Sequence, residues 1–193
     1  MHLKGQLHIH TTLSDGRLMP QQVADEYSEL GFNFIAYTDH DHLLKSSYRD
    51  SIKAVKTKMI VFFGIELTIG TRWGYVHVSR IEGEKEILHT FNHPGEHGFS
   101  VQHTMEAIED VSKNLNIDAV EITHHGFLSK EYDTNTIPYP KVATDDSHAA
   151  MGCGRAWIEL DATKKKDSII KAIKNGDFSC CYVRTPQIKM VIG

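Results

Sequence analysis

The chain has 193 residues, of which 40% are hydrophobic and 24% charged, and its formal net charge is -4. This composition excludes an intrinsically disordered chain, and the length suits one well-buried domain, which we expect to span residues 1–193. The mildly acidic balance excludes the broad basic face on which tight nucleic-acid binding depends.

The predicted elements alternate between strands and helices. Pro20 opens the first amphipathic helix, and Gly31 follows as its stop. In chain order, we expect a strand at 4–10, a helix at 20–30, a strand at 32–37, a helix at 45–56, strands at 59–63, 75–81 and 87–91, a helix at 101–115, strands at 119–122, 141–144 and 156–160, and a helix at 167–175 capped by Gly176. This order predicts an α/β protein with a mostly parallel sheet.

Residues 126–140 form the least regular segment, because tyrosine, aspartate, asparagine, proline and lysine follow one another without a helical period. We interpret this segment as a surface loop that borders a substrate pocket.

The N-terminal residues lack the charged and then apolar run of a secretory signal, and no segment approaches an apolar span of about 18 residues. We therefore expect a cytoplasmic protein with no membrane contact. The three cysteines, Cys153, Cys180 and Cys181, have no zinc-finger spacing and no evident disulfide framework, so we expect them to serve packing.

Histidine is unusually frequent, with 13 copies, and several copies stand where a predicted strand ends. In a (β/α) barrel the carboxyl ends of the strands converge on one face, where active sites are built. Such strand-end or in-strand positions are occupied by His8, His10, Asp39, His40, Glu66, His77, His93, His124, Asp146 and His148. The pattern predicts a site assembled from most of the chain.

Spacing indicates metal binding by two pairs of these residues. His8 and His10 are two residues apart on a strand, so their side chains share a face, and Asp146 and His148 repeat this relation. Histidine nitrogen with carboxylate oxygen suits Zn²⁺, and also Mn²⁺ or Fe²⁺.

A single strand-end histidine is more often structural than a metal ligand, and for His8-x-His10 taken alone metal binding and a structural role are about equally frequent. Chance is a poor explanation for histidines and carboxylates at so many successive strand ends, and this favours a metal site. The structural interpretation remains for four other histidines: His2, His89, His97 and His103.

Five strings in this order resemble the motifs of the PHP (polymerase and histidinol phosphatase) family. They are Leu7-His8-Ile9-His10-Thr11-Thr12 with Ser14-Asp15-Gly16, Tyr37-Thr38-Asp39-His40, Gly64-Ile65-Glu66, His93-Pro94-Gly95 and Asp146-Ser147-His148-Ala149. The match runs from residue 7 to about 149. The resemblance implies a distorted seven-stranded (β/α) barrel with a trinuclear metal centre.

The resemblance also implies which side chains hold each ion. His8, His10, Glu66 and Asp146 would hold the first ion, and Asp15, His40 and His148 the second. Glu66, His77 and His93 would hold the third, so that Glu66 bridges two ions. His77 rests on its spacing after Glu66 and its strand setting rather than on a motif.

Two features depart from the family pattern. The usual helix between Glu121 and Asp146 is replaced by the irregular loop. His124 and His125 stand where the resemblance implies no ligand; contact with phosphate, proton donation and a structural role are all open.

The chemistry expected from such a centre is hydrolysis of a phosphate ester by a metal-activated water. Besides Glu66, the catalytic candidates are Asp39, Asp146 and His148, which could move protons near that water. Cations that could grip a substrate phosphate are Arg17, Lys130, Arg155 and Arg184; Arg17 and Lys130 rank first because they lie near predicted site loops, although each is more often a solvated cation. His124 joins Arg17 and Lys130 as a substrate-binding candidate.

The sequence therefore predicts a hydrolase with two or three divalent ions (Zn, Mn or Fe), acting on a small phosphomonoester or nucleotide, with no obligate protein partner evident. A 5'-3' exonuclease that takes short oligonucleotides is the nearest alternative, because end-first entry needs few basic contacts. A noncatalytic metal-stabilised module that binds phosphorylated ligands is another. Hydrolysis of a carbon–nitrogen bond ranks lower, since Glu66 rather than a lysine would bridge the metals.

Overall fold

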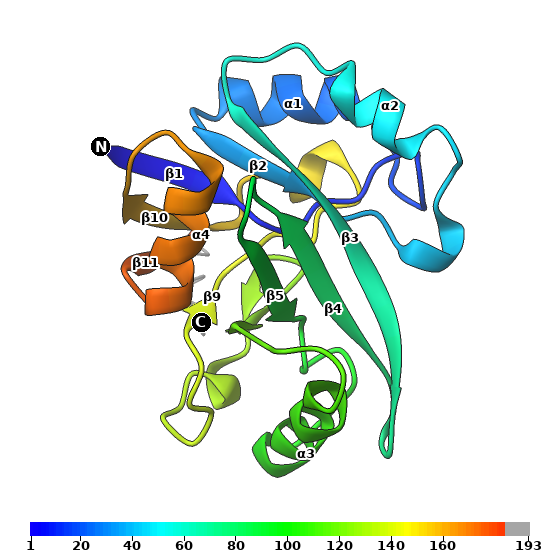
Figure 1. Ribbon diagram of the computed structural model, residues 1–193, viewed down its shortest axis with the longest axis vertical. Helices are drawn as coiled ribbons and strands as arrows, with labels where there is room; N and C mark the ends of the chain where they lie inside the picture. Colours follow the sequence, from blue (N-terminus) through cyan, green and yellow to red (C-terminus); the bar gives the residue numbers. More distant parts are fainter. Residues whose placement is uncertain (184–193) are drawn as a thin grey trace, which may run out of the picture.

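The computed structural model describes residues 1–183, so the candidate cation Arg184 lies outside the described residues. It shows a mixed α/β fold in which one curved sheet carries helices on its outside (Figure 1). The strands of this sheet are β1 (His2–Gln6), β2 (Phe34–Tyr37), β3 (Ile60–Thr71), β4 (Gly74–Glu82), β5 (Ile87–Phe91), β6 (Ala119–Glu121), β9 (Lys141–Val142), β10 (Ala156–Asp161) and β11 (Phe178–Tyr182).

The sheet forms a nearly closed barrel. Its strand order is β11-β10-β1-β2-β3-β4-β5-β6-β9, and an isolated parallel bridge between Ile9 and Ser147 joins the segment after β1 to the segment after β9. The predicted barrel is confirmed, but the predicted count of seven strands is wrong, because the sheet formed by residues 1–183 has nine. Seven strands run from β1 to β9 around the barrel, while β10 and β11 extend the sheet beyond β1.

The prediction of a mostly parallel sheet is also wrong. Of the eight strand pairs, four are parallel (β1–β2, β2–β3, β5–β6 and β6–β9) and four are antiparallel (β1–β10, β10–β11, β3–β4 and β4–β5). The cause is that β3, β4 and β5 follow one another through short connections without a helix, and short connections produce antiparallel neighbours. Gly74, with φ +111°, makes the tight turn between β3 and β4.

The remaining elements cover or border this barrel. The helices are α1 (Pro20–Glu29), α2 (Tyr48–Lys53), α3 (Val101–Ser112) and α4 (Lys166–Asn175), with 3₁₀ turns at Asp41–Leu43, Lys130–Tyr132 and Ala150–Gly152. A separate hairpin pairs β7 (Thr123–His124) with β8 (Phe127–Leu128). Segment 126–140 thus contains a two-residue strand and one 3₁₀ turn, and no α-helix lies between Glu121 and Asp146.

Apolar side chains on the helices and strands form the core that fixes these elements. Helix α1 buries Val23, Ala24 and Tyr27, and α4 buries Ile169, Ile170 and Ile173. These faces were predictable from the helical spacing of the apolar residues. Together they hold the strands so that the loops at one end of the barrel have fixed positions.

None of the helices within residues 1–183 is both long and apolar enough to cross a membrane.

Candidate metal centre

Glu66 lies at the centre of a group of five histidines that come from four different parts of the chain. It sits within β3, its side chain is fully buried, and its carboxylate oxygens approach five imidazoles. The nitrogen–oxygen distances are 3.2 Å to His8, 3.3 Å to His10, 2.9 Å to His40, 3.6 Å to His77 and 3.2 Å to His93. The structure therefore brings together residues up to 85 positions apart in sequence around one carboxylate.

Two further carboxylates complete the arrangement. Asp146 Oδ1 lies 3.5 Å from His8 and 3.3 Å from His10, and Asp15 lies 3.5 Å from His40 and 3.4 Å from His148. All nine residues predicted as metal ligands thus surround one region. Ligand atoms within 4.8 Å of one another occur in the sets His8, His10, Glu66; His10, Asp15, His40, His148; and His40, Glu66, His77.

The nitrogen and oxygen atoms of this group are better suited to binding divalent cations than to forming hydrogen bonds with one another. Glu66 Oε2 and His40 Nδ1 lie 2.9 Å apart, yet neither has a partner with hydrogen-bond geometry, and His10 Nδ1 and His77 Nδ1 are also buried without one. Buried polar atoms are normally paired, and unpaired ones call for an explanation such as a missing ion. Imidazole nitrogen and carboxylate oxygen are the donors that Zn²⁺, Mn²⁺ and Fe²⁺ accept.

The pKa values of the histidines and carboxylates in this group depend on one another. Burial alone would raise the pKa of Glu66, but His8, His10 and His40 lower this pKa well below its ordinary value. Burial would likewise lower the pKa of His10, but the nearby carboxylates of Asp146 and Glu66 raise it to about 9. Protons on His8, His10 and His93, whose pKa values are raised, therefore offset the charge of the carboxylates, and a bound cation would displace them.

A residue outside the ligand sets holds the loop that carries Asp15. Asp39, a predicted catalytic residue, accepts hydrogen bonds from the Thr11 backbone N–H and hydroxyl and from the Ser14 hydroxyl at 2.7–2.9 Å. These contacts make Asp39 an anchor of the loop before Asp15.

Two of the predicted ligands have a strained backbone. His93 and Asp146 have φ of 23° and 45°, which is unfavourable for residues with a side chain and is found most often at functional sites.

Sequence reasoning missed two polar residues that support the centre. Glu121 is fully buried and its Oε2 lies 3.0 Å from His8 Nδ1, while Asn92 donates to Glu66 Oε1 at 2.7 Å. A carboxylate behind a ligating histidine fixes the orientation of its ring. The signal in the sequence was a charged residue inside the apolar strand Ala119-Val120-Glu121-Ile122, where an unpaired carboxylate would be costly.

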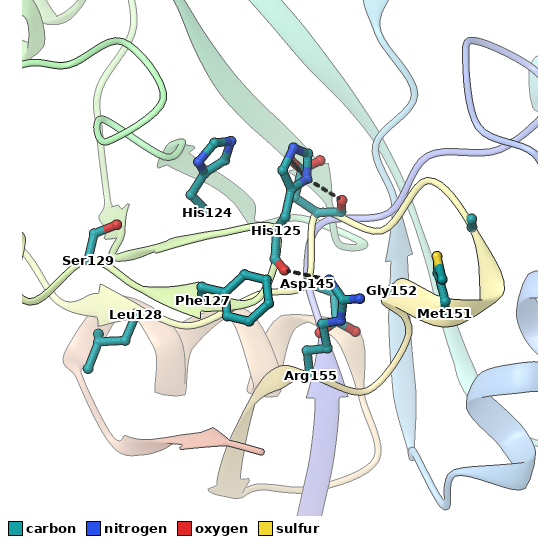
Figure 2. Close-up of a pocket in the computed structure, with 11 residues that line it drawn as sticks. His124, His125, Phe127, Leu128, Ser129, Asp145, Met151, Gly152 and Arg155 are labelled. Atoms are coloured by element: carbon teal, nitrogen blue, oxygen red, sulfur yellow. Dashed lines mark hydrogen bonds and ion pairs between the residues drawn. The ribbon is translucent and has the colours of Figure 1, made fainter. Parts of the chain in front are cut away.

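Two cavities meet at the centre. The smaller, about 130 Å³, is lined by Asp15, His40, Glu66, His77, His93, Glu96, His125, Asp146 and His148. The larger, about 480 Å³, shares His125 and Asp146 with it and is also lined by Phe127, Met151 and Arg155 (Figure 2). His125 Nδ1 lies 3.1 Å from Asp146 Oδ2, so this pair stands between the two cavities.

Some of the predicted substrate-binding residues line the large cavity, and others do not. His124 and Arg155 line it, with Ser129 and Leu128 from segment 126–140, as predicted for a loop that borders a pocket. Arg17 and Lys130 are exposed and line neither cavity. The ranking of Arg17 and Lys130 above Arg155 therefore has no support in the geometry.

Comparison with known proteins gives a family match over most of the chain. The family model described as PHP domain matches residues 6–176. No curated protein matches the chain.

Solved structures with low sequence identity share the fold. A two-domain protein from Bacteroides vulgatus, described as containing a predicted PHP-like metal-dependent phosphoesterase, is 17% identical with a TM-score of 0.72; 94% of this chain is covered, and the chain spans 65% of that protein. PsfC from Pseudomonas syringae is 12% identical with a TM-score of 0.69, over 94% of this chain and 92% of PsfC. An amidohydrolase from Chromobacterium violaceum with bound sulfate and no metal is 12% identical with a TM-score of 0.63, over 75% and 87%.

Proposed function

The chain belongs to the PHP domain family, and on that premise we propose that it is a metal-dependent hydrolase that cleaves a small phosphomonoester or nucleotide. The observation that carries the proposal is Glu66, a fully buried carboxylate that lines the smaller cavity and has five imidazoles within 3.6 Å. Burying so many ionisable groups together is destabilising unless they bind something. Two or three divalent ions would give them that partner.

The ligand sets are those that the family resemblance implies, and the distances between their side chains support them. His8, His10, Glu66 and Asp146 would hold the first ion, and Asp15, His40 and His148 the second. His77 and His93 would hold the third on the other side of Glu66. Bound ions would activate a water molecule as the nucleophile and offset the negative charge of the phosphate.

Residues of the chain itself would position the substrate and move its protons. His125 lines both cavities, so a phosphate at the ions and a leaving group in the larger cavity would place the ester oxygen near its ring. We assign His125 the donation of a proton to the leaving oxygen. Asp146 and His148 remain candidates for accepting the proton of the attacking water, since both line the smaller cavity.

The larger cavity suits the organic part of such a substrate. Phe127 and Met151 are 57% and 81% exposed, and they offer apolar surface on two sides of the opening (Figure 2). Arg155 lies beside Phe127, with the guanidinium carbon 5.2 Å from the ring centre, and could contact a second anionic group. A cavity of about 480 Å³ is in the range of small-molecule sites.

The test is release of inorganic phosphate from a panel of phosphomonoesters, nucleotides and short oligonucleotides by the protein loaded with Zn²⁺, Mn²⁺ or Fe²⁺. We expect turnover of small substrates and its loss in Glu66→Gln, with His103→Gln as a control because His103 lies on α3, where its ring stacks on Trp73. Turnover confined to oligonucleotides would favour the exonuclease, and stoichiometric metal without any turnover would favour the noncatalytic module.

The larger cavity has its own test. Arg155→Gln should lower kcat/KM about 10- to 100-fold if Arg155 contacts an anionic group of the substrate, mainly through KM. Arg17→Gln is the matched control, since Arg17 is exposed and lines neither cavity. Equal effects of the two substitutions would contradict the placement of the substrate in this cavity.

A further inference from the structure

Two side chains beside the centre belong to none of the ligand sets considered so far. Glu96 and His97 lie in the loop after β5, and together with His77 and His93 they offer four ligand atoms within 4.8 Å of one another. The sequence interpretation gave His97 a structural role and did not single out Glu96. The geometry brings both into the group nevertheless.

The backbone of the loop directs these side chains toward one point. The Glu96 N–H donates to the His93 carbonyl at 3.0 Å, and the Gly98 N–H donates to the Gly95 carbonyl at 3.2 Å. Gly98, with φ 63°, and His93, with φ 23°, permit this tight reversal of the chain. The reversal brings ligand atoms of His93, Glu96 and His97 within 4.8 Å of one another and of His77 in β4.

The contacts inside the group lack hydrogen-bond geometry. His93 Nδ1 and Glu96 Oε2 lie 2.7 Å apart, yet His93 Nδ1 has no hydrogen-bond partner, and neither has His77 Nδ1 or His97 Nε2. All three nitrogens are buried. Three buried imidazole nitrogens without a hydrogen-bond partner in one cluster are an observation that an ion bound among them would explain.

We propose that His77, His93, Glu96 and His97 hold one divalent cation in a site closed by four protein side chains. Three imidazoles and one carboxylate suit tetrahedral Zn²⁺, and a site with four protein ligands leaves no open position for substrate or water. This ion orders the loop of residues 93–98, and the ions at Glu66 and Asp15 face the substrate. Glu66 is then not a ligand of the third ion.

The competing role for Glu96 is to orient His93 by a hydrogen bond while Glu66 and His77 complete the site. In that arrangement His97 contributes nothing to metal binding. His97 and Glu66 therefore distinguish the two arrangements.

The experiment is zinc content after dialysis against a buffered chelator, for the wild type, Glu96→Gln, His97→Gln and Glu66→Gln, with His103→Gln as the matched histidine control. We expect His97→Gln and Glu96→Gln each to bind one zinc fewer than the wild type, or to bind that zinc at least about 100-fold more weakly. Glu66→Gln should keep this zinc while losing metal elsewhere. Full zinc content and affinity in His97→Gln would overturn the proposal.

A second measurement uses the wild type, so that it does not depend on a variant that folds poorly. Co²⁺ substituted for zinc in the wild type should give strong visible absorption if it occupies a closed tetrahedral site. Weak absorption typical of six-coordinate cobalt at every occupied site would contradict the four-ligand site. Neither readout requires turnover, so failure of the proposed hydrolase activity and failure of this site are distinguishable.

Discussion

Asp145 should be the residue on which the position of Asp146 and His148 most depends, although it does not belong to the predicted ligands. Its carboxylate is 1% exposed and accepts three hydrogen bonds. The donors are the Tyr27 hydroxyl at 2.8 Å, the Gly154 N–H at 2.6 Å and the Ala156 N–H at 2.7 Å. These bonds tie the loop that carries Asp146 to helix α1 and to the start of β10.

The magnitude for Asp145→Asn follows from these donors. Asparagine keeps one oxygen, so its amide group must face either the Ala156 N–H or the Tyr27 and Gly154 donors. One buried N–H left unpaired costs about 1–3 kcal/mol, and the remaining bonds lose their charge assistance. We expect a loss of about 2–4 kcal/mol in the free energy of unfolding of the metal-free protein. For a chain of this length that corresponds to a fall in Tm of roughly 5–15 °C.

The assay is thermal and urea unfolding in the presence of a chelator, followed by zinc content of the folded variant. Tyr27→Phe removes one of the three donors and should give a smaller loss of about 1–2 kcal/mol. Asp161→Asn is the control, because the Asp161 side chain is 80% exposed. A loss below about 1 kcal/mol in Asp145→Asn, or unchanged zinc content at limiting metal, would refute this reasoning.

Three further predictions concern other parts of the molecule. Glu121→Gln removes the carboxylate 3.0 Å from His8 Nδ1 and should weaken binding of the first ion about 10- to 100-fold in a zinc competition titration. Gly5→Ala places a Cβ 1.8 Å from the ring of Phe34 and should lower the free energy of unfolding by about 1–3 kcal/mol in urea. Glu82→Gln should lower the free energy of unfolding by up to about 1 kcal/mol at pH 7, with the difference lost as pH falls through the lowered pKa of Glu82.

The pH dependence follows from the direction of the Glu82 shift. Burial alone would raise the pKa of Glu82, but Arg80 and Arg49 lower it below its ordinary value in the folded protein. A lowered pKa means that the stabilisation is present above the pKa of the unfolded chain and is lost as pH falls through the folded pKa. A difference between Glu82→Gln and wild type that persists at acid pH would contradict this origin.

Matched variants keep the other two predictions specific. Gly70→Ala is the control for Gly5→Ala, since its Cβ would have its nearest contact at 3.9 Å. Equal losses from the two alanines would point to backbone freedom rather than to the Phe34 ring. Glu131→Gln is the control for Glu121→Gln, because Glu131 is an exposed carboxylate on the 3₁₀ turn. Equal zinc affinity of wild type and Glu121→Gln would contradict the orienting role of Glu121.

Much of the barrel could be predicted from the sequence, because apolar periodicity and the proline and glycine signals depend on only a few neighbouring residues. The strand at 87–91 has the predicted bounds, and α1 begins at Pro20 as predicted. The long strand β3 did not follow, because its continuation through Glu66 to Thr71 depends on pairing with β4. Strand β11 was missed because Phe178-Ser179-Cys180-Cys181-Tyr182 has no strict alternation and pairs only with β10.

The candidate site was predictable where a motif or strand end marks a residue. The grouping around Glu66 agrees with that expectation, although the binding of ions there stays a prediction. The sequence alone could not show the supporting contacts of Asp39, because its hydrogen bonds to Thr11 and Ser14 depend on how a distant loop folds. Glu96, Glu121 and Asp145 were missed for the same reason, since tertiary contacts rather than neighbours in sequence give them their partners.

The most direct test of the central claim is phosphate release from a small phosphomonoester by chelator-treated protein, measured as Mn²⁺ or Zn²⁺ is added back and bound metal is counted. We predict no turnover without metal, turnover that rises with occupancy, and none in Glu66→Gln at any metal concentration. Turnover that is independent of bound metal, or that survives in Glu66→Gln at the wild-type rate, would contradict a metal-dependent phosphoesterase centred on Glu66.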